Sequence, residues 1–238
     1  DAPGDALRIE RPAPGPQGDQ GAAACAGPGL RARRDAASLT VTGSAGLKIT
    51  GALNAAINTV DGSAGTAAQN LTLGTTTATS DSVKTGSGAD IINIAAVGAD
   101  KVTVALGAGN DVLKVGGAGG IGAYLLGTTL DGGDGTGDVV NITDGAAYTA
   151  ATAAFLSNFE VLDVSGGTGT YDVSLSSFAT AQLDASVSGV NTGGITFSNA
   201  PQSFTFNVAS AKGADLAVAG GIIELLKTDS TAPATDSV

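Results

Sequence analysis

The sequence contains no His, no Trp and no Met, and its only Cys is Cys25. Without imidazoles, and with one isolated thiol, the chain lacks the ligands of a conventional zinc or copper site. A single Cys also excludes an internal disulfide, so cross-links within the chain cannot stabilise the fold. Aromatic residues make up only 4% of the sequence, which argues against a globular core built around large rings.

Arginine is absent after Arg34, whereas all six Lys lie beyond that residue. Segment 1–35 is rich in Pro, Gly and Arg and shows no strand or helix period, so we expect a disordered or foreign segment. Residues 35–238 carry six Lys and 18 acidic residues, a net charge of −12 (6 − 18). We expect no nucleic-acid partner for such a charge, and no apolar run approaches the roughly 18 residues of a membrane span.

The chain beyond residue 35 also lacks the groups that catalysis needs. It has no Arg and no His, and no Ser lies in a nucleophile motif with a base partner. A polysaccharide lyase built on a β-solenoid needs a base, and usually a cation to bind an acidic sugar, so that class is disfavoured. We therefore predict that the chain is not an enzyme.

Beyond Ala36, short β-type runs alternate with turn clusters of Gly, Asn, Asp, Ser and Thr, as strands bounded by turns do. Examples are SLTVTG, DIINIA, DKVTVALG and DVLKVGG. Two architectures fit this pattern, a sandwich of hairpins and a parallel β-solenoid. Because the turn precedes the strand in the same way each time, the pattern favours an all-β parallel solenoid. One short helix is expected within residues 146–160, where Ala, Leu and Phe interrupt the strand pattern.

Four aspartates fall on successive turns at steps of 9, 10 and 11 residues: Asp81, Asp90, Asp100 and Asp111. If each turn and its strand form half a coil, Asp81 stacks with Asp100 along one edge and Asp90 with Asp111 along the other. The glycines before them let the backbone aim carbonyls inward. Carbonyls and carboxylates together suit calcium, which takes about six to eight oxygens. The same aspartates also fit ordinary turns, so both interpretations stay open.

Two stretches, GSGADIINI (Gly86–Ile94) and GAGNDVLKV (Gly107–Val115), resemble the calcium-binding nonapeptide repeats of RTX proteins, G-G-x-G-x-D-x-U-x. Each matches four of the five defined positions, VGADKVTV matches three, and in GGDGTGDVVNI the last Asp lies one residue late. The resemblance implies a right-handed parallel β-roll, calcium between the turns and export by a type I secretion machinery. The candidate calcium ligands are Asp81, Gly86, Gly88, Asp90, Gly98, Asp100, Gly107, Gly109, Asn110, Asp111, Asp131, Asp134 and Asp138.

The flanking repeats are rich in Thr, Ala and Ser and resemble bacterial surface-layer (S-layer) proteins and large surface adhesins. The chain divides into the segment 1–35, Thr/Ala-rich solenoid coils at 36–80, a calcium-binding β-roll at 81–142, further coils at 143–228 and a flexible tail at 229–238.

The expected function is a non-catalytic structural module of a secreted bacterial cell-surface protein, folded and assembled by calcium. The alternative is a calcium-dependent folding and secretion module of a larger adhesin, toxin or hydrolase whose active domain lies outside this chain. Expected partners are further copies of the chain, in a lattice or filament, and a cell-surface polysaccharide.

Overall fold

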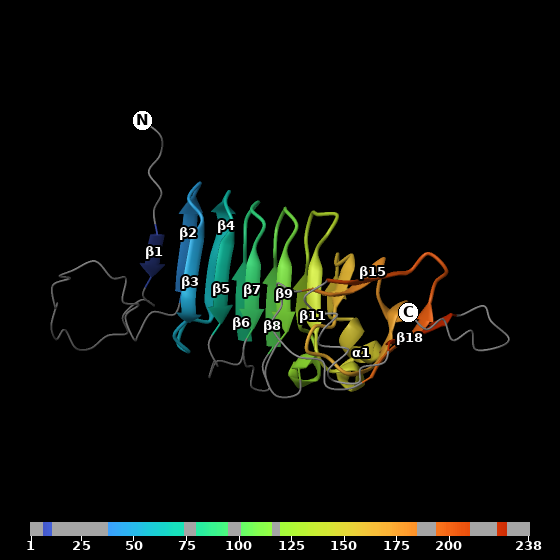
Figure 1. The fold of residues 1–238 in the computed structure, drawn as a ribbon. Coiled ribbons are helices and arrows are strands. Elements are labelled where there is room, and N and C mark those ends of the chain that lie inside the picture. The colour runs from blue at the N-terminus through green and yellow to red at the C-terminus, as the bar shows by residue number, and fades with distance from the viewer. Residues whose placement is uncertain are drawn as a thin grey trace.

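The computed structural model describes residues 7–10, 38–73, 80–94, 101–115, 120–184, 194–209 and 223–227. Within these ranges the strands stack side by side along one axis (Figure 1). Every described strand pair is parallel except the first, β1 with β2. The architecture is the parallel β-solenoid that the sequence predicts, and not a sandwich of hairpins.

Two long sheets form the faces of the solenoid, and a third sheet follows where the first one ends. The first sheet contains β1 (Leu7–Glu10), β2 (Ser38–Gly43), β4 (Thr59–Gly65), β6 (Ser80–Lys84), β8 (Lys101–Ala105), β10 (Thr129–Asp131) and β12 (Leu156–Ser157). The second sheet contains β3 (Leu47–Ala52), β5 (Gln69–Leu73), β7 (Ile91–Ile94), β9 (Val112–Val115), β11 (Val139–Ile142), β13 (Val161–Asp163), β15 (Thr180–Leu183) and β17 (Thr205–Val208). The third sheet contains β14 (Gly169–Asp172), β16 (Ile195–Ala200) and β18 (Ile223–Lys227).

β1 lies in the segment for which the sequence predicts disorder. It pairs antiparallel with β2, from Leu7 opposite Val41 to Glu10 opposite Ser38, and continues the first sheet beyond β2. The expectation of disorder is therefore wrong for these four residues. Their sequence, Leu-Arg-Ile-Glu, does alternate apolar and charged residues, but the run is too short to stand out in a Pro/Gly-rich segment. An added strand satisfies backbone groups that β2 would otherwise present at an open edge.

The core consists of aliphatic columns that run along the solenoid axis. One fully buried column occupies the same register position on consecutive strands of the second sheet: Leu71, Ile92, Leu113, Val140 and Leu162. Residues between the core positions point to the outer face, as half-buried Thr72 does between buried Leu71 and Leu73. Because like residues stack on like residues, this core is filled by branched aliphatic side chains and needs few rings.

Aromatic side chains gather in the later coils. Tyr171 lies between Tyr148 and Phe197, with ring centroids 6.3 and 5.9 Å away, and Phe197 lies 5.2 Å from Phe206. This stack fills the core where the first sheet gives way to the third sheet.

The described helices are all short and lie in the same half of the chain: η1 (Gly120–Ala123), η2 (Gly145–Ala147), α1 (Ala150–Ala153) and η3 (Val173–Leu175). α1 begins at a capping box between Thr149 and Thr152, and it confirms the short helix expected within residues 146–160. None of the helices in the described part of the chain is long and apolar enough to cross a membrane.

Candidate functional site

The turns that lead from the first sheet into the second stack directly on one another. The Gly86 carbonyl accepts a hydrogen bond from the Ala108 amide at 2.8 Å, and the Gly107 carbonyl accepts one from the Asp134 amide at 2.6 Å. Successive turns are therefore joined by backbone hydrogen bonds, and equivalent residues of neighbouring coils lie above one another.

Glycine is required at two of these stacked positions. Gly107 and Gly133 have φ values of +85° and +94°, a region that favours glycine over residues with a Cβ. A Cβ at Gly107 would also overlap the Gly86 carbonyl oxygen, and one at Gly133 would overlap that of Gly107. The glycines thus permit both the turn conformation and the close approach of adjacent coils.

Each of these turns ends in an acidic residue that caps the coil before it. The Asp90 amide donates to Asp111 Oδ1 at 2.7 Å, the Asp111 amide to Asp138 Oδ1 at 2.8 Å, and the Asp138 amide to Glu160 Oε2 at 2.9 Å. We call Asp90, Asp111, Asp138 and Glu160 the carboxylate ladder. The ladder brings Asp90 and Asp111 together on one edge, as their spacing predicts, and includes Asp138 despite its extra residue.

The three aspartates of the ladder are fully buried, and the second oxygen of each, Oδ2, makes no hydrogen bond among the described residues. Burial raises the pKa of Asp111 to about 7, and the negative charges of Asp90 and Asp138 add to this rise. Burial likewise raises the pKa values of Asp90 and Asp138. A buried row of like charges is costly unless a proton or a cation neutralises it.

Backbone oxygens lie beside the ladder carboxylates. A Cβ at Gly135 would overlap both the Gly109 carbonyl oxygen and the Asp138 carboxylate, so these groups lie close together. One coil earlier, a Cβ at Gly109 would overlap the Gly88 carbonyl oxygen and lie 3.3 Å from Asp111 Oδ1. In the described part of the chain, no hydrogen bond reaches the Gly88 or Gly109 carbonyl. Each of these two steps therefore places a backbone carbonyl oxygen close to a ladder carboxylate.

This donor set fits a hard cation such as calcium, whose ligands are carboxylate and carbonyl oxygens together with water. At one step of the stack the Asp111 carboxylate and the Gly88 carbonyl would hold an ion, and at the next step the Asp138 carboxylate and the Gly109 carbonyl would do so; the Asp90 carboxylate lies one coil earlier. Among the described residues no group of three or more His, Cys, Asp or Glu side chains could hold a metal ion. An ion at the ladder would therefore depend on backbone carbonyls and water for most of its ligands.

Three other candidate ligands lie near the ladder but do not point into it. Asn110 is exposed, and its Oδ1 accepts from the Thr136 amide at 3.4 Å. Asp131 Oδ1 accepts from the Gly133 amide and from Asn158 Nδ2, at 3.1 and 2.7 Å. The Asp134 side chain is exposed, and only its backbone joins the turn stack. Their contacts support the turns and the surface.

The structure does not place Asp81 on a turn, where the sequence predicts that it stacks with Asp100 along a second edge. Asp81 is the second residue of β6 and pairs in register with Val102, a buried residue two positions beyond Asp100. Asp81 is itself buried and lies within β6, so it is a strand residue and not a turn residue. Gly98 and Asp100 lie outside the described residues.

The sequence does not predict the two residues at the ends of this row, Gln69 beside Asp90 and the ladder residue Glu160 beside Asp138. At one end the Gln69 amide donates to Asp90 Oδ1 at 2.7 Å, while Gln69 Nε2 donates to the Gly62 carbonyl. At the other end Glu160 accepts from Asp138. Neither residue follows a Gly-x-Gly motif, but Gln69 lies 21 residues before Asp90 and Glu160 lies 22 after Asp138. That coil-length spacing, at the start of a strand, is the signal that could have found them.

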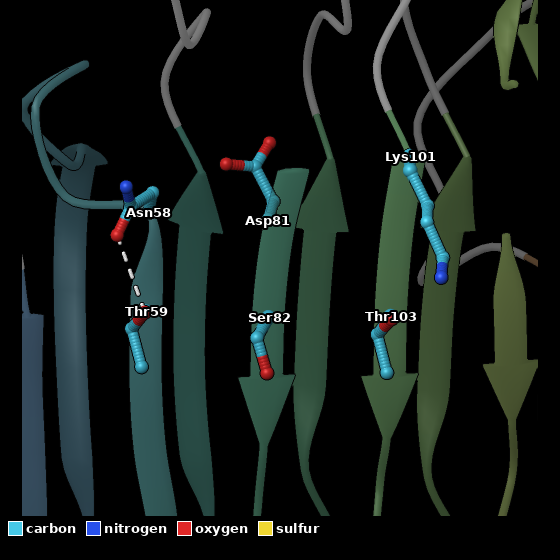
Figure 2. Close-up of a pocket in the computed structure, with 6 residues that line it drawn as sticks. All are labelled: Asn58, Thr59, Asp81, Ser82, Lys101 and Thr103. Carbon is cyan, nitrogen blue, oxygen red and sulfur yellow. Dashed lines mark hydrogen bonds between the residues drawn. The ribbon is translucent and has the colours of Figure 1, made fainter. Parts of the chain in front are cut away.

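A polar groove of about 340 Å³ lies on the outer face of the first sheet, across β4, β6 and β8. Figure 2 shows Thr59, Ser82 and Thr103 in one row across these strands, with Asn58, Asp81 and Lys101 nearer the strand starts. Thr59 and Ser82 are register neighbours, as are Ser82 and Thr103. The six lining residues offer hydrogen-bonding groups but no aromatic ring on which a sugar could stack.

Comparison of the chain with protein-family models, with curated proteins and with solved structures finds no match.

Proposed function

We propose that this chain is a non-catalytic structural module of a secreted bacterial cell-surface protein, an S-layer lattice component, in which calcium holds the coils together. The observation that carries the proposal is the carboxylate ladder, whose buried Oδ2 atoms on Asp90, Asp111 and Asp138 lack hydrogen-bond partners. When bound, calcium supplies the positive charge that this row of carboxylates needs. The ladder residues position the coils and bind the ion, and no chemical step is involved.

The location of the site within the fold supports a role in folding. The ladder joins coils that are 21 to 27 residues apart in the chain, from Gln69 to Glu160. Neutralising it therefore stabilises contacts between neighbouring coils directly, and binding free energy becomes folding free energy. Extracellular calcium modules bind at about 10⁻⁴ to 10⁻³ M. A site of that affinity is empty in a cytosol and filled outside the cell, which suits an exported chain.

The alternative is a calcium-dependent folding and secretion module of a larger adhesin, toxin or hydrolase. The local physics is the same, because both functions require calcium to fold the turns. They differ in assembly, since an S-layer component forms ordered sheets or filaments with copies of itself. The polysaccharide partner stays a prediction, for which the groove on the first sheet is the candidate surface.

The proposal is tested by titrating calcium into the purified chain by isothermal titration calorimetry and then examining the product by electron microscopy. Asp111→Asn should weaken binding at least tenfold, because it removes one ladder charge while keeping an oxygen for the Asp90 amide. Asp61→Asn is the matched control, since Asp61 is exposed and its carboxylate bonds only to Ser63 among the described residues. Ordered arrays that form with calcium support the S-layer function, and calcium binding without arrays supports the alternative. If neither wild type nor control binds calcium, both functions are wrong.

A further inference from the structure

A second buried acidic group lies at the opposite ends of the second-sheet strands. Asn141, Asp163 and Gln182 are register neighbours on β11, β13 and β15. Together with Ser165 and Asp184, which follow β13 and β15, they form what we call the Asp163 cluster. Asp163 lies three residues beyond Glu160 along β13, about 10 Å at the usual rise of a strand. The cluster is therefore separate from the carboxylate ladder.

Hydrogen bonds fix the members of the Asp163 cluster. Asp163 Oδ1 accepts from the Ser165 amide at 2.7 Å, and Ser165 Oγ accepts from the Asp184 amide at 2.8 Å. Asn141 Nδ2 donates to the backbone carbonyls of Asp163 and Ser165 at 3.1 and 3.3 Å. Gln182 Nε2 donates to Asp184 Oδ2 at 3.3 Å. These contacts fix Asp163 and Asp184 on adjacent coils, close enough for the Asp184 charge to act on Asp163.

One oxygen of this cluster is left without a partner. Asp163 is fully buried, and its Oδ2 makes no hydrogen bond among the described residues. Burial raises the pKa of Asp163, and the nearby charge of Asp184 adds to the rise. A carboxylate buried beside a second carboxylate needs a neutralising proton or cation.

We propose that the Asp163 cluster is a second binding site for a hard divalent cation of the calcium type, with Asp163 Oδ2 and the Asp184 carboxylate as its anionic ligands. Both ligands are oxygens, and the cluster contains no nitrogen or sulfur group suited to a softer metal. The cation joins the coil of β13 to the coil of β15, at the ends of these strands that lie away from the ladder. This site does not depend on the glycine-rich turns, so it stands or falls separately from the proposed function.

Tyr171 provides a spectroscopic probe of this site. Burial raises the pKa of Tyr171, and the charges of Asp144 and Asp163 add to the rise, so the phenol lies within the electrostatic reach of Asp163. Its Oη donates to the Ile142 carbonyl at 3.0 Å. Terbium(III), which replaces calcium at oxygen sites, emits strongly when a nearby tyrosine is excited. We therefore expect tyrosine-sensitised terbium emission to report on the Asp163 cluster.

The experiment compares terbium titrations, with calcium competition, of the wild-type chain and of Asp163→Asn, Asp111→Asn and Asp61→Asn. Asp163→Asn retains an oxygen for the Ser165 amide, and circular dichroism verifies its fold. We expect Asp163→Asn to weaken the tyrosine-sensitised site at least tenfold, and Asp111→Asn and Asp61→Asn to change it less than twofold. If Asp163→Asn does not fold, Asp184→Asn decides the question with the same expected loss.

Wild-type emission that is absent, or that is unchanged in the folded Asp163 or Asp184 variant, overturns the proposal and leaves Asp163 as a protonated acid. Loss of the ladder's calcium binding in Asp111→Asn, with the tyrosine-sensitised site intact, supports both sites independently. Retention of the ladder affinity in Asp111→Asn contradicts only the proposed function.

Discussion

Asp111 is flanked by two other carboxylates, Asp90 on the preceding coil and Asp138 on the following one. Burial and these neighbours raise its pKa to about 7 in the folded chain, whereas an unfolded Asp titrates near 3.9. Between these values the folded state binds more protons than the unfolded state. Stability that is present below about pH 4 is therefore lost as the pH rises toward 7.

We predict that Asp111→Asn removes part of this pH dependence. In chelator, the free energy of unfolding of the wild type should fall relative to the variant between pH 5 and pH 7, by up to about 1.4 kcal/mol per pH unit. Urea unfolding at a series of pH values measures the difference. With saturating calcium at pH 7 the order should reverse, because the variant has lost a ligand.

The control for this prediction is Asp61→Asn, because hydrogen bonds from Ser63 lower the pKa of Asp61. Its difference from wild type should not grow between pH 5 and pH 7. If the free energies of unfolding of wild type and Asp111→Asn changed with pH in the same way in chelator, the raised pKa of Asp111 would be contradicted.

A Cβ at Gly107 tests how closely the turns must stack. The residue has φ +85°, and an added Cβ would overlap the Gly86 carbonyl oxygen. Gly107→Ala should lower the free energy of unfolding by about 1–3 kcal/mol, the usual cost of a strained backbone position. The overlap with the Gly86 carbonyl adds to this cost. Gly51→Ala is the control, since nothing lies within 4 Å of its added Cβ. Equal stability of the two variants in thermal or urea unfolding would refute the close stacking of the turns.

At the residue scale, the sequence predicts the residues that carry the repeat motif and misses those that share only its position. Asp90 and Asp111 are predictable because glycines two and four residues earlier mark the turn. Gln69 and Glu160 occupy the same register position without those glycines. Asp163 is hidden because it lies within a strand, where an isolated Asp resembles an ordinary outward-facing polar residue.

At the scale of elements, alternation of apolar and polar residues predicts most strands, because one face of each strand is buried. Asp138 joins the ladder despite the extra residue, since the turn accommodates it at exposed positions such as Thr136. The third sheet is not predictable from local pattern. It arises where β12 ends the first sheet and β14 pairs with β16 instead, a choice made by packing between distant coils.

The aliphatic columns make a separate prediction about the second sheet. Leu113 is fully buried between Ile92 and Val140, so Leu113→Ala leaves a cavity and should cost about 2–5 kcal/mol. The cost should be similar with and without calcium, because Leu113 carries no charge. Lys101→Ala, at an exposed position, should change the free energy of unfolding by less than about 0.5 kcal/mol. Equal values for the two variants in urea unfolding would contradict the stacked core.

At the scale of the whole molecule, the chain beyond Arg34 combines a net charge of −12 with coils that approach closely enough to share backbone hydrogen bonds. Coils in such a stack contact mainly their neighbours, so stability is close to a sum of interfaces between adjacent coils. The carboxylate ladder lies at several of these interfaces. Neutralising it with calcium should therefore strengthen several neighbouring coils together, whereas leaving it charged weakens them together.

Hydrogen exchange of the ladder amides, in calcium and in chelator, tests this account most directly. The amides of Asp90 and Asp111 donate to the carboxylates of the next coil, so their protection reports whether the ladder is closed. We predict that at neutral pH chelator lowers protection of Gly86–Asp90 and Gly107–Asp111 at least tenfold, and that added calcium restores it. Protection that is the same in calcium and in chelator would contradict the account and identify these aspartates as ordinary turn residues.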